Sequence, residues 1–313
     1  MSILISGSLA YDYIMDFPDS FKNHILPDQI HILNVCFVVD ELKKNLGGTA
    51  GNIAYTMKLL GGEPLILGVL GTDAKDYLEA LKKQNIETAR IRKSEQRLSA
   101  SAHITTDKDD NQITAFYSGA GEEGPELSLD TITENMELAI IAPSKKETMI
   151  KHAKEAYERN IPIVLDPGQQ ITALSGREMA MLMGQAHFLI ANDYEMKLIQ
   201  EKTGWDASEM LEHVDVLVTT LGEKGSRVAK GSETIEIQAC KPHSVDDPTG
   251  AGDAYRAGFF AAYAKGHDLK TCGQAGSVAA SYAIEQYGTQ NHSFTIDEFS
   301  QRYKDAYKEN FKF

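Results

Sequence analysis

The stretch Asp246-Asp247-Pro248-Thr249-Gly250-Ala251-Gly252-Asp253 opens a helical segment that continues to Ala264. Its glycines expose backbone N–H groups at the positive end of that helix, where a phosphate group can bind without a basic side chain. Asp253 could simply offset the helix dipole, but a glycine-rich turn between carboxylates also lets the chain touch a substrate and a cation together. The small residues that follow predict close packing that holds this helix end rigidly, namely Ala254, Ala257, Gly258, Ala261 and Ala262.

Two further glycine clusters differ in quality. Residues 47–52, Gly-Gly-Thr-Ala-Gly-Asn, lead into a helical segment, and Asn52 adds a side chain with both donor and acceptor atoms. Residues 119–124 match the spacing G-x-G-x-x-G of a dinucleotide-binding loop. However, two glutamates inside that loop would repel a pyrophosphate, and Pro125 follows where the helix should already run. We interpret this third cluster as a mobile acidic loop.

Composition and missing motifs exclude several classes of function. The chain has 313 residues, and 31 Lys and Arg against 45 Asp and Glu give a net charge of −14, which disfavours nucleic-acid and membrane-surface binding. It contains no apolar run of about 20 residues, no basic signal-peptide region and only three scattered cysteines. Neither a G-x-x-x-x-G-K-[ST] loop nor a protein-kinase motif set is present. We therefore expect a cytoplasmic protein outside those two nucleotide-binding classes.

Short apolar runs alternate with helical patterns along most of the chain. This alternation predicts an α/β fold with a mostly parallel sheet that helices cover on both faces. The expected strands lie at 3–8, 65–69, 139–142, 161–166, 188–191 and 214–219. The expected helices lie at 50–60, 73–84, 147–159, 176–185, 193–203, 251–265, 275–287 and 297–309.

Two regions, about 12–46 and 99–118, break this alternation. They contain period-2 segments at 30–35 and 103–106, and residues 107–111 predict the turn of a hairpin. Strands that alternate polar and apolar residues suit a sheet with one face in water. We expect these two regions to form a small β lid beside the main sheet, within one domain that spans residues 1–313.

With these residues in view, the sequence resembles the ribokinase-like (PfkB) family of carbohydrate and nucleoside kinases. Residues 47–52 and 247–253 are similar to the N- and C-terminal signatures of that family. Three other segments match it in order, namely Gly7–Asp12, Asn192–Glu195 and Val218–Gly225. The resemblance runs from about residue 3 to the C-terminal helices, and the shared order and spacing make it strong.

The resemblance implies a three-layer α/β/α sandwich with a small β-sheet lid, and ATP-dependent phosphorylation of a primary hydroxyl. It assigns Asp253 as the catalytic base and Gly250, Ala251 and Gly252 as an anion hole. The remaining assignments are Asp12, Gly48 and Asn52 for the substrate; Asn192, Glu195, Thr219, Gly222 and Gly225 for ATP and Mg²⁺; and Asp247 and Thr249 for a monovalent cation such as K⁺.

The phosphate acceptor is harder to predict. Ribokinase-like sugar kinases usually carry a Glu where this chain has Ala142-Pro143-Ser144, and the stretch Leu26–Gly62 looks most like bacterial adenosine-kinase-type members. The resemblance therefore favours adenosine as acceptor and a role in purine salvage. Phe37 and Phe116 are candidates for the wall against the base, although ordinary packing explains each as well. Asp166, which ends a strand, either faces the phosphates or begins a helix.

Two alternatives stay open at this stage. One is a sugar kinase of the same family for ribose, fructose or a sugar phosphate, and Lys43, Lys44 and Arg97 are available to bind a phosphate. The other is a nucleoside or nucleotide sensor without catalysis, which would be expected to lack the Asp at position 253. The lid is compatible both with a homodimer interface and with a free monomer.

Overall fold

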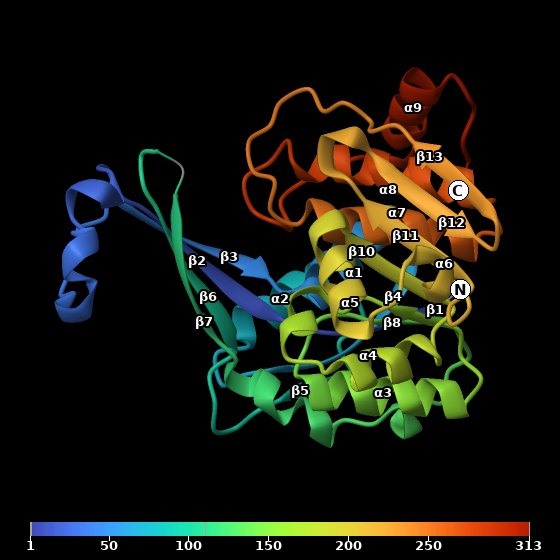
Figure 1. The fold of residues 1–313 in the computed structure, drawn as a ribbon, viewed down its shortest axis with the longest axis horizontal. Helices are drawn as coiled ribbons and strands as arrows, with labels where there is room; N and C mark the ends of the chain where they lie inside the picture. Colours follow the sequence, from blue (N-terminus) through green and yellow to red (C-terminus); the bar gives the residue numbers. More distant parts are fainter. Residues whose placement is uncertain (1, 110, 313) are drawn as a thin grey trace.

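The computed structural model of this chain describes residues 2–109 and 111–312, and a nine-stranded sheet forms its centre (Figure 1). The strand order is β13-β12-β11-β10-β9-β8-β1-β4-β5, and all neighbours are parallel except the two antiparallel pairs that involve β12. The strands are β1 (Ser2–Ser6), β4 (Glu63–Leu70), β5 (Ile91–Lys93), β8 (Met136–Ile141), β9 (Ile163–Leu165), β10 (Phe188–Asn192), β11 (Val216–Thr220), β12 (Ser226–Lys230) and β13 (Glu233–Ile237).

Helices cover both faces of this sheet, which confirms the predicted three-layer α/β/α class. Alternate residues of each strand belong to different clusters, as Ile3 and Ile5 pack with one helix layer and Leu4 with the other. One layer holds α1 (Thr49–Leu59), α2 (Lys75–Lys83), α7 (Ala251–Ala264), α8 (Leu269–Ala283) and α9 (Ile296–Tyr307); the other holds α3 (Lys146–Glu158), α4 (Gly176–Met183), α5 (Asp193–Thr203) and α6 (Ala207–Met210). Within the described ranges, no helix has the length and apolarity to cross a membrane.

A second sheet, here called the small sheet, projects from the body of the molecule (Figure 1). Its order is β3-β2-β6-β7, with bounds β2 (Ala10–Asp16), β3 (Glu41–Gly47), β6 (Ala100–Thr106) and β7 (Gln112–Tyr117). At its root, the Tyr11 ring packs edge-on against Tyr77 of α2, and Tyr11 Oη donates a hydrogen bond to Asp73 O. The small sheet therefore has a fixed base on the main body.

One strand prediction in this region is wrong. Residues 30–35 do not form a strand, because a 3₁₀ helix occupies Pro27–Ile32 and irregular chain follows to residue 40. β2 is paired with β3 on one side and with β6 on the other, and residues 30–35 do not add to the outer edge of β3. Segment 17–40 is instead held by an aromatic cluster in which Phe37 packs on Phe17 and Phe21.

Two further expectations need correction. The helix expected at 275–287 begins earlier, at Leu269, because the carboxylate of Asp268 accepts a hydrogen bond from Thr271 N and caps it. Residues Gly119–Glu126 form a 3₁₀ helix rather than a mobile loop, and Glu122 pairs with Lys145 at 2.8 Å. The two glutamates that would repel a pyrophosphate thus form ion pairs, Glu122 with Lys145 and Glu123 with Arg92.

Candidate active site

The candidate site lies where the N-terminus of α7 meets the carboxyl ends of the parallel strands. Ligands of open α/β sheets bind at this edge, because helix N-termini and strand ends converge there. Gly250 caps α7 in the left-handed region with φ of +79°, and a Cβ at this position would lie 2.9 Å from Thr289 Cγ2. Ala254 N donates the first intrahelical hydrogen bond, to Gly250 O, and Ala251 N donates to Pro248 O in the turn that precedes the helix.

Asp253, in the first turn of α7, is bound by a residue from the opposite side of the site. Asn52 Nδ2 on α1 donates a 2.8 Å hydrogen bond to Asp253 Oδ2. Burial raises the pKa of the Asp253 carboxyl to about 7, and the charge of Arg256 opposes this rise. The two glycine clusters singled out in the sequence therefore meet at one carboxylate that titrates near neutral pH.

Asn52 is itself held from behind by residues that the sequence did not indicate. Thr289 Oγ1 lies 2.8 Å from Asn52 Oδ1, and Gln290 Nε2 donates to the same oxygen at 3.0 Å. Gln290 also donates to Tyr77 Oη, which in turn donates to Gly47 O. This chain of bonds fixes the orientation of the Asn52 amide.

A buried ion pair lies one helical turn beyond Asp253. Arg256 Nε and Nη2 bind the two carboxylate oxygens of Asp166 at 2.5 and 2.7 Å, in the bidentate geometry typical of Arg. Asp166 directly follows β9 and is buried. Neither predicted role of Asp166 describes this contact, because its carboxylate faces a guanidinium rather than a phosphate or a helix N-terminus.

A row of four residues crosses the face of the small sheet that carries Asp12. The register pairs Asn45 with Asp12, Asp12 with Ala102, and Ala102 with Phe116. Burial raises the pKa of Asp12 to about 6, and the negative charge of Asp247 adds to the rise. Asn45 Nδ2 is buried and has no hydrogen-bond acceptor among the residues that the structure describes, so a donor is left for a ligand.

The aromatic candidates Phe37 and Phe116 have different surroundings. Phe37 lies in the aromatic cluster of segment 17–40, away from the row of Asp12. Phe116 is 61% exposed and stands on the same face as Asp12, beside Ile104 of the neighbouring strand. Of the two candidates, Phe116 is therefore the one available to contact a ligand on this face.

Residues expected on the nucleotide side lie along the same sheet edge. Asn192 Oδ1 accepts a hydrogen bond from Glu195 N, and Glu195 Oε2 accepts one from Asn192 N, so this pair caps α5. Burial raises the pKa of Glu195, while the bond from Asn192 N opposes the rise. Thr219 lies on β11, and Gly222 and Gly225 turn the chain toward β12 with φ of +59° and +92°.

No cluster of three or more His, Cys, Asp or Glu side chains arranged to hold a metal occurs within residues 2–109 and 111–312. The oxygens of Asp247 accept hydrogen bonds from Thr249 N at 2.9 Å and Gly288 N at 3.0 Å. Asp247 therefore shapes the loop before α7 with both oxygens. A divalent ion at this site would need the phosphate oxygens of a nucleotide as its main ligands.

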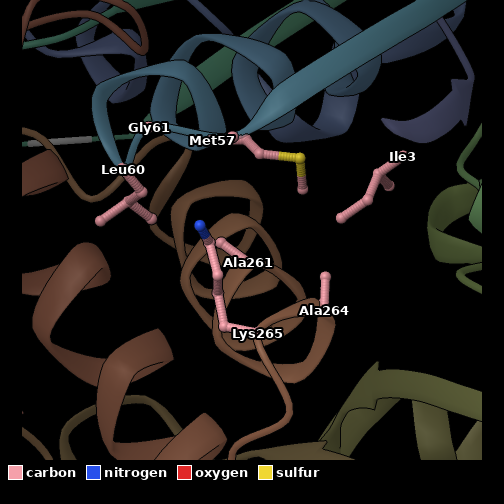
Figure 2. A pocket seen from close by; sticks show the side chains of 8 residues that line it. Ile3, Met57, Leu60, Gly61, Ala261, Ala264 and Lys265 are labelled. Carbon is pink, nitrogen blue, oxygen red and sulfur yellow. The ribbon is translucent and has the colours of Figure 1, made fainter. Parts of the chain in front are cut away.

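A small pocket lies at the opposite end of α7 (Figure 2). Ile3, Met57, Leu60 and Lys265 are among its lining residues, and its cavity volume is about 30 Å³. A single water needs roughly 10–15 Å³ by the same measure, so this pocket suits one or two waters. It is too small for a substrate and is separate from the site around Asp253.

Comparison with known proteins agrees with this geometry. Residues 25–296 match the family model described as pfkB family carbohydrate kinase. The chain is 36% identical to a nucleoside kinase from Methanocaldococcus jannaschii, with 95% of this chain and 94% of that protein covered. It is 30% identical to a nucleoside kinase from Methanothermobacter thermautotrophicus, at coverages of 96% and 95%.

A solved structure extends this comparison to the fold. The nucleoside kinase from Burkholderia thailandensis, in complex with inosine, superposes with a TM-score of 0.90 at 35% identity. The alignment covers 98% of this chain and 99% of that one. The main sheet, its helices and the small sheet therefore form the ribokinase-like arrangement that the sequence motifs predict.

Proposed function

Because the chain belongs to the pfkB family of carbohydrate kinases, we propose that it transfers the γ-phosphoryl group of Mg·ATP to the 5′-hydroxyl of a nucleoside, with adenosine as the preferred acceptor. The observation that carries this proposal is the Asp253 carboxylate at the N-terminus of α7, held by the Asn52 amide at 2.8 Å. This arrangement supplies a proton acceptor beside a site for the transferred phosphate. The activity would place the protein in purine salvage.

Asp253 acts on the attacking hydroxyl. In a loose phosphoryl-transfer transition state the nucleophile needs orientation more than early deprotonation, so a carboxylate of modest basicity suffices. Burial raises the pKa of Asp253 to about 7, which leaves about half of the carboxylate ionised near neutral pH and strengthens the group as a base. Asn52 holds the carboxylate in place while it receives the proton.

The first-turn amides of α7 stabilise charge on the group in transfer. The backbone at Gly250, Ala251 and Gly252 is held in place before substrate arrives, and Ala251 N exchanges its bond to Pro248 O for one to the phosphate. Magnesium, bound through the phosphates of ATP, supplies further charge neutralisation when present. Asn192 and Glu195 border the nucleotide side, and Asp247 with Thr249 is the proposed place for a monovalent cation.

The small sheet favours a nucleoside over a free sugar. Along the row that crosses it, Asp12 and Phe116 are two strands apart, which corresponds to about 10 Å. A carboxylate for ribose hydroxyls and an aromatic face for a base at that separation fit the two ends of a nucleoside. The similarity of the whole chain to nucleoside kinases supports the same acceptor class.

Two of the three candidate cations for a sugar phosphate, Lys43 and Lys44, are already paired with carboxylates. Lys43 Nζ lies 2.9 Å from Glu41 Oε2 and also pairs with Asp16. Lys44 Nζ lies 3.5 Å from Asp76 Oδ2 and above the ring of Tyr11. A phosphate on the acceptor would have to displace these carboxylates, which disfavours a sugar phosphate as substrate.

The test is ADP release from Mg·ATP with a panel of adenosine, inosine, cytidine, ribose, fructose and fructose 6-phosphate. We expect kcat/KM for adenosine to exceed that for either free sugar by at least about 100-fold, because a sugar leaves the base site empty. Higher kcat/KM for inosine than for adenosine would retain the nucleoside class but reject the preferred acceptor. Turnover confined to a sugar, or nucleoside binding without turnover, would contradict the proposal.

A further inference from the structure

The buried pair of Arg256 and Asp166 lies close to the chemistry but contacts no substrate position proposed above. The exposed fraction is 8% for the Arg256 side chain and 1% for that of Asp166. A buried ion pair often contributes little net stability, because both charges must leave water. Its presence directly behind Asp253 therefore calls for a role beyond holding the fold together.

One contact ties this pair to the anion hole. Arg256 Nη1 donates a 3.0 Å hydrogen bond to Gly252 O, while Nε and Nη2 bind Asp166. The Gly252 carbonyl and the Asp253 N–H belong to the same planar peptide unit. A guanidinium anchored at the end of β9 thus fixes the peptide plane that joins Gly252, a residue of the proposed anion hole, to Asp253, the proposed base.

The same guanidinium also influences the charge of the base. Its positive charge lowers the pKa of Asp253, which burial raises, and the charges of Asp166 and Asp12 act in the opposite direction. Other titratable groups face this cluster: Glu195 of α5 interacts with both Arg256 and Asp166, and Tyr77 of α2 interacts with Asp253. Arg256 is the cation that balances these carboxylates.

We propose that Arg256 is a positioning residue for phosphoryl transfer, which Asp166 locks so that it fixes the Gly252–Asp253 peptide and holds a positive charge near the Asp253 carboxylate. This inference rests on the proposed kinase activity but not on which nucleoside is the acceptor. Arg256 lies one helical turn after the proposed base and makes its printed hydrogen bonds to Asp166 and Gly252 O, so its substitution tests the transfer step more directly than acceptor binding.

The main test compares Arg256→Met and Arg256→Lys. For Arg256→Met we expect kcat to fall by about 100-fold with KM for the acceptor within about threefold, since the lost interactions serve the transition state. The midpoint of the rise of kcat/KM with pH should move up, because removal of the cation raises the pKa of Asp253. Arg256→Lys should restore the wild-type pH midpoint but only part of kcat, because Lys keeps the positive charge and loses the bidentate contact with Asp166.

Two further variants separate positioning from folding. Arg302 forms a comparable bidentate pair with Glu285, at 2.7 and 3.0 Å, so Arg302→Met is the matched control and should keep the wild-type kcat and pH midpoint. The double variant Arg256→Met/Asp166→Asn removes both buried charges and should fold even if Arg256→Met alone does not. Its kcat should stay at least about tenfold low, because the link to Gly252 O is still lost.

A readout without substrate completes the test. Carbon NMR titration of the Asp253 carboxyl in the ligand-free protein, assigned through Asp253→Asn, should show a higher pKa in Arg256→Met than in the wild type. Wild-type kcat in the folded double variant, or an unchanged titration in Arg256→Met, would overturn the inference. Absence of turnover in the wild type with every acceptor would instead reject the proposed function, and the titration would still decide the electrostatic role of Arg256.

Discussion

The two halves of the site are built differently. On the main body, Asn52 of α1 and Asp253 and Arg256 of α7 each have protein partners, and every link of the network is a defined hydrogen bond or ion pair. On the small sheet, Phe116 is 61% exposed and Asn45 Nδ2 is without an acceptor among the described residues. The half proposed for chemistry is therefore complete without ligand, whereas the half proposed for recognition is completed by the substrate.

This difference follows from what each half has to do. Charge stabilisation is strongest when donors are fixed in advance, which favours buried, fully bonded side chains. Recognition requires entry and release, which favours a sheet that meets the body only at its root. We expect the small sheet to close over a bound nucleoside and exclude water, which would otherwise accept the phosphate.

Asp253→Asn should have the largest effect on kcat, because it removes the proposed base from the half of the site proposed for chemistry. We expect kcat to fall by about 10³-fold, within the range typical of a positioned general base, and KM to change little. Steady-state kinetics with adenosine provides the measurement. An Asp253→Asn variant with wild-type kcat would remove Asp253 from the mechanism.

The same variant should also change stability in a pH-dependent way. The Asp253 pKa of about 7 lies above its unfolded value of 3.8, so the folded state binds the proton more tightly and stability decreases as pH rises between these values. Asp253→Asn should therefore raise Tm more at about pH 8 than at about pH 5. Equal Tm shifts at both pH values would contradict the raised pKa.

Gly250→Ala should cause the second-largest fall in kcat. Its φ of +79° disfavours any side chain, and the new Cβ would press on Thr289, which holds Asn52. We expect kcat to fall by about 10²-fold, because misplacement of catalytic groups is costly even at small displacements. Gly266→Ala is the control: it has φ of +83° at the other end of α7, with open space around it, and should keep the wild-type kcat.

Asp12→Asn tests the recognition half. Hydrogen bonds to a charged group contribute about 1.5–3 kcal/mol, so KM for adenosine should rise by about 10- to 100-fold with kcat nearly unchanged. With a pKa of about 6, wild-type Asp12 should also bind the ribose better as pH rises past that value. Asp16→Asn, on the same strand but paired with Lys43, should leave KM unchanged. A fall in kcat for Asp12→Asn at constant KM would place Asp12 in the chemical half.

Phe116→Ala should have the smallest effect. Loss of stacking on the base costs about 1 kcal/mol at an exposed site, which raises KM by about fivefold. Ile113→Ala provides the control, because Ile113 lies on the same strand and faces the other side of the sheet. Equal KM values for the two variants would show that the base does not contact Phe116.

Sequence patterns were most informative where they are local. The glycines of residues 247–253 predicted the helix N-terminus, and the alternation of apolar runs predicted the main sheet. Both features depend on residues that are close together in the sequence. The pair of Arg256 and Asp166 is separated by 90 positions, and Thr289 lies 237 positions from Asn52. No periodicity encodes such contacts, although a lone Arg in a helix of small residues was a visible signal.

In the small sheet, a local sequence pattern predicted a strand that does not form. Residues 30–35 carry an alternating pattern but form no strand, although the outer edge of β3 has no partner strand in the small sheet, so the pattern alone does not determine pairing. Phe37 and Phe116 looked equivalent in the sequence, and only the register places Phe116 in the row of Asp12. Recognition of the acceptor thus depends on tertiary contacts that local patterns do not specify.

The most direct test of the account uses 5′-deoxyadenosine with Mg·ATP. This analogue retains the base and both ribose hydroxyls proposed to bind the small sheet, but lacks the hydroxyl proposed to meet Asp253. We predict competitive inhibition of adenosine phosphorylation with an inhibition constant near KM for adenosine, and no transfer of phosphate to the analogue. Phosphorylation of 5′-deoxyadenosine would contradict the account, as would a complete lack of inhibition.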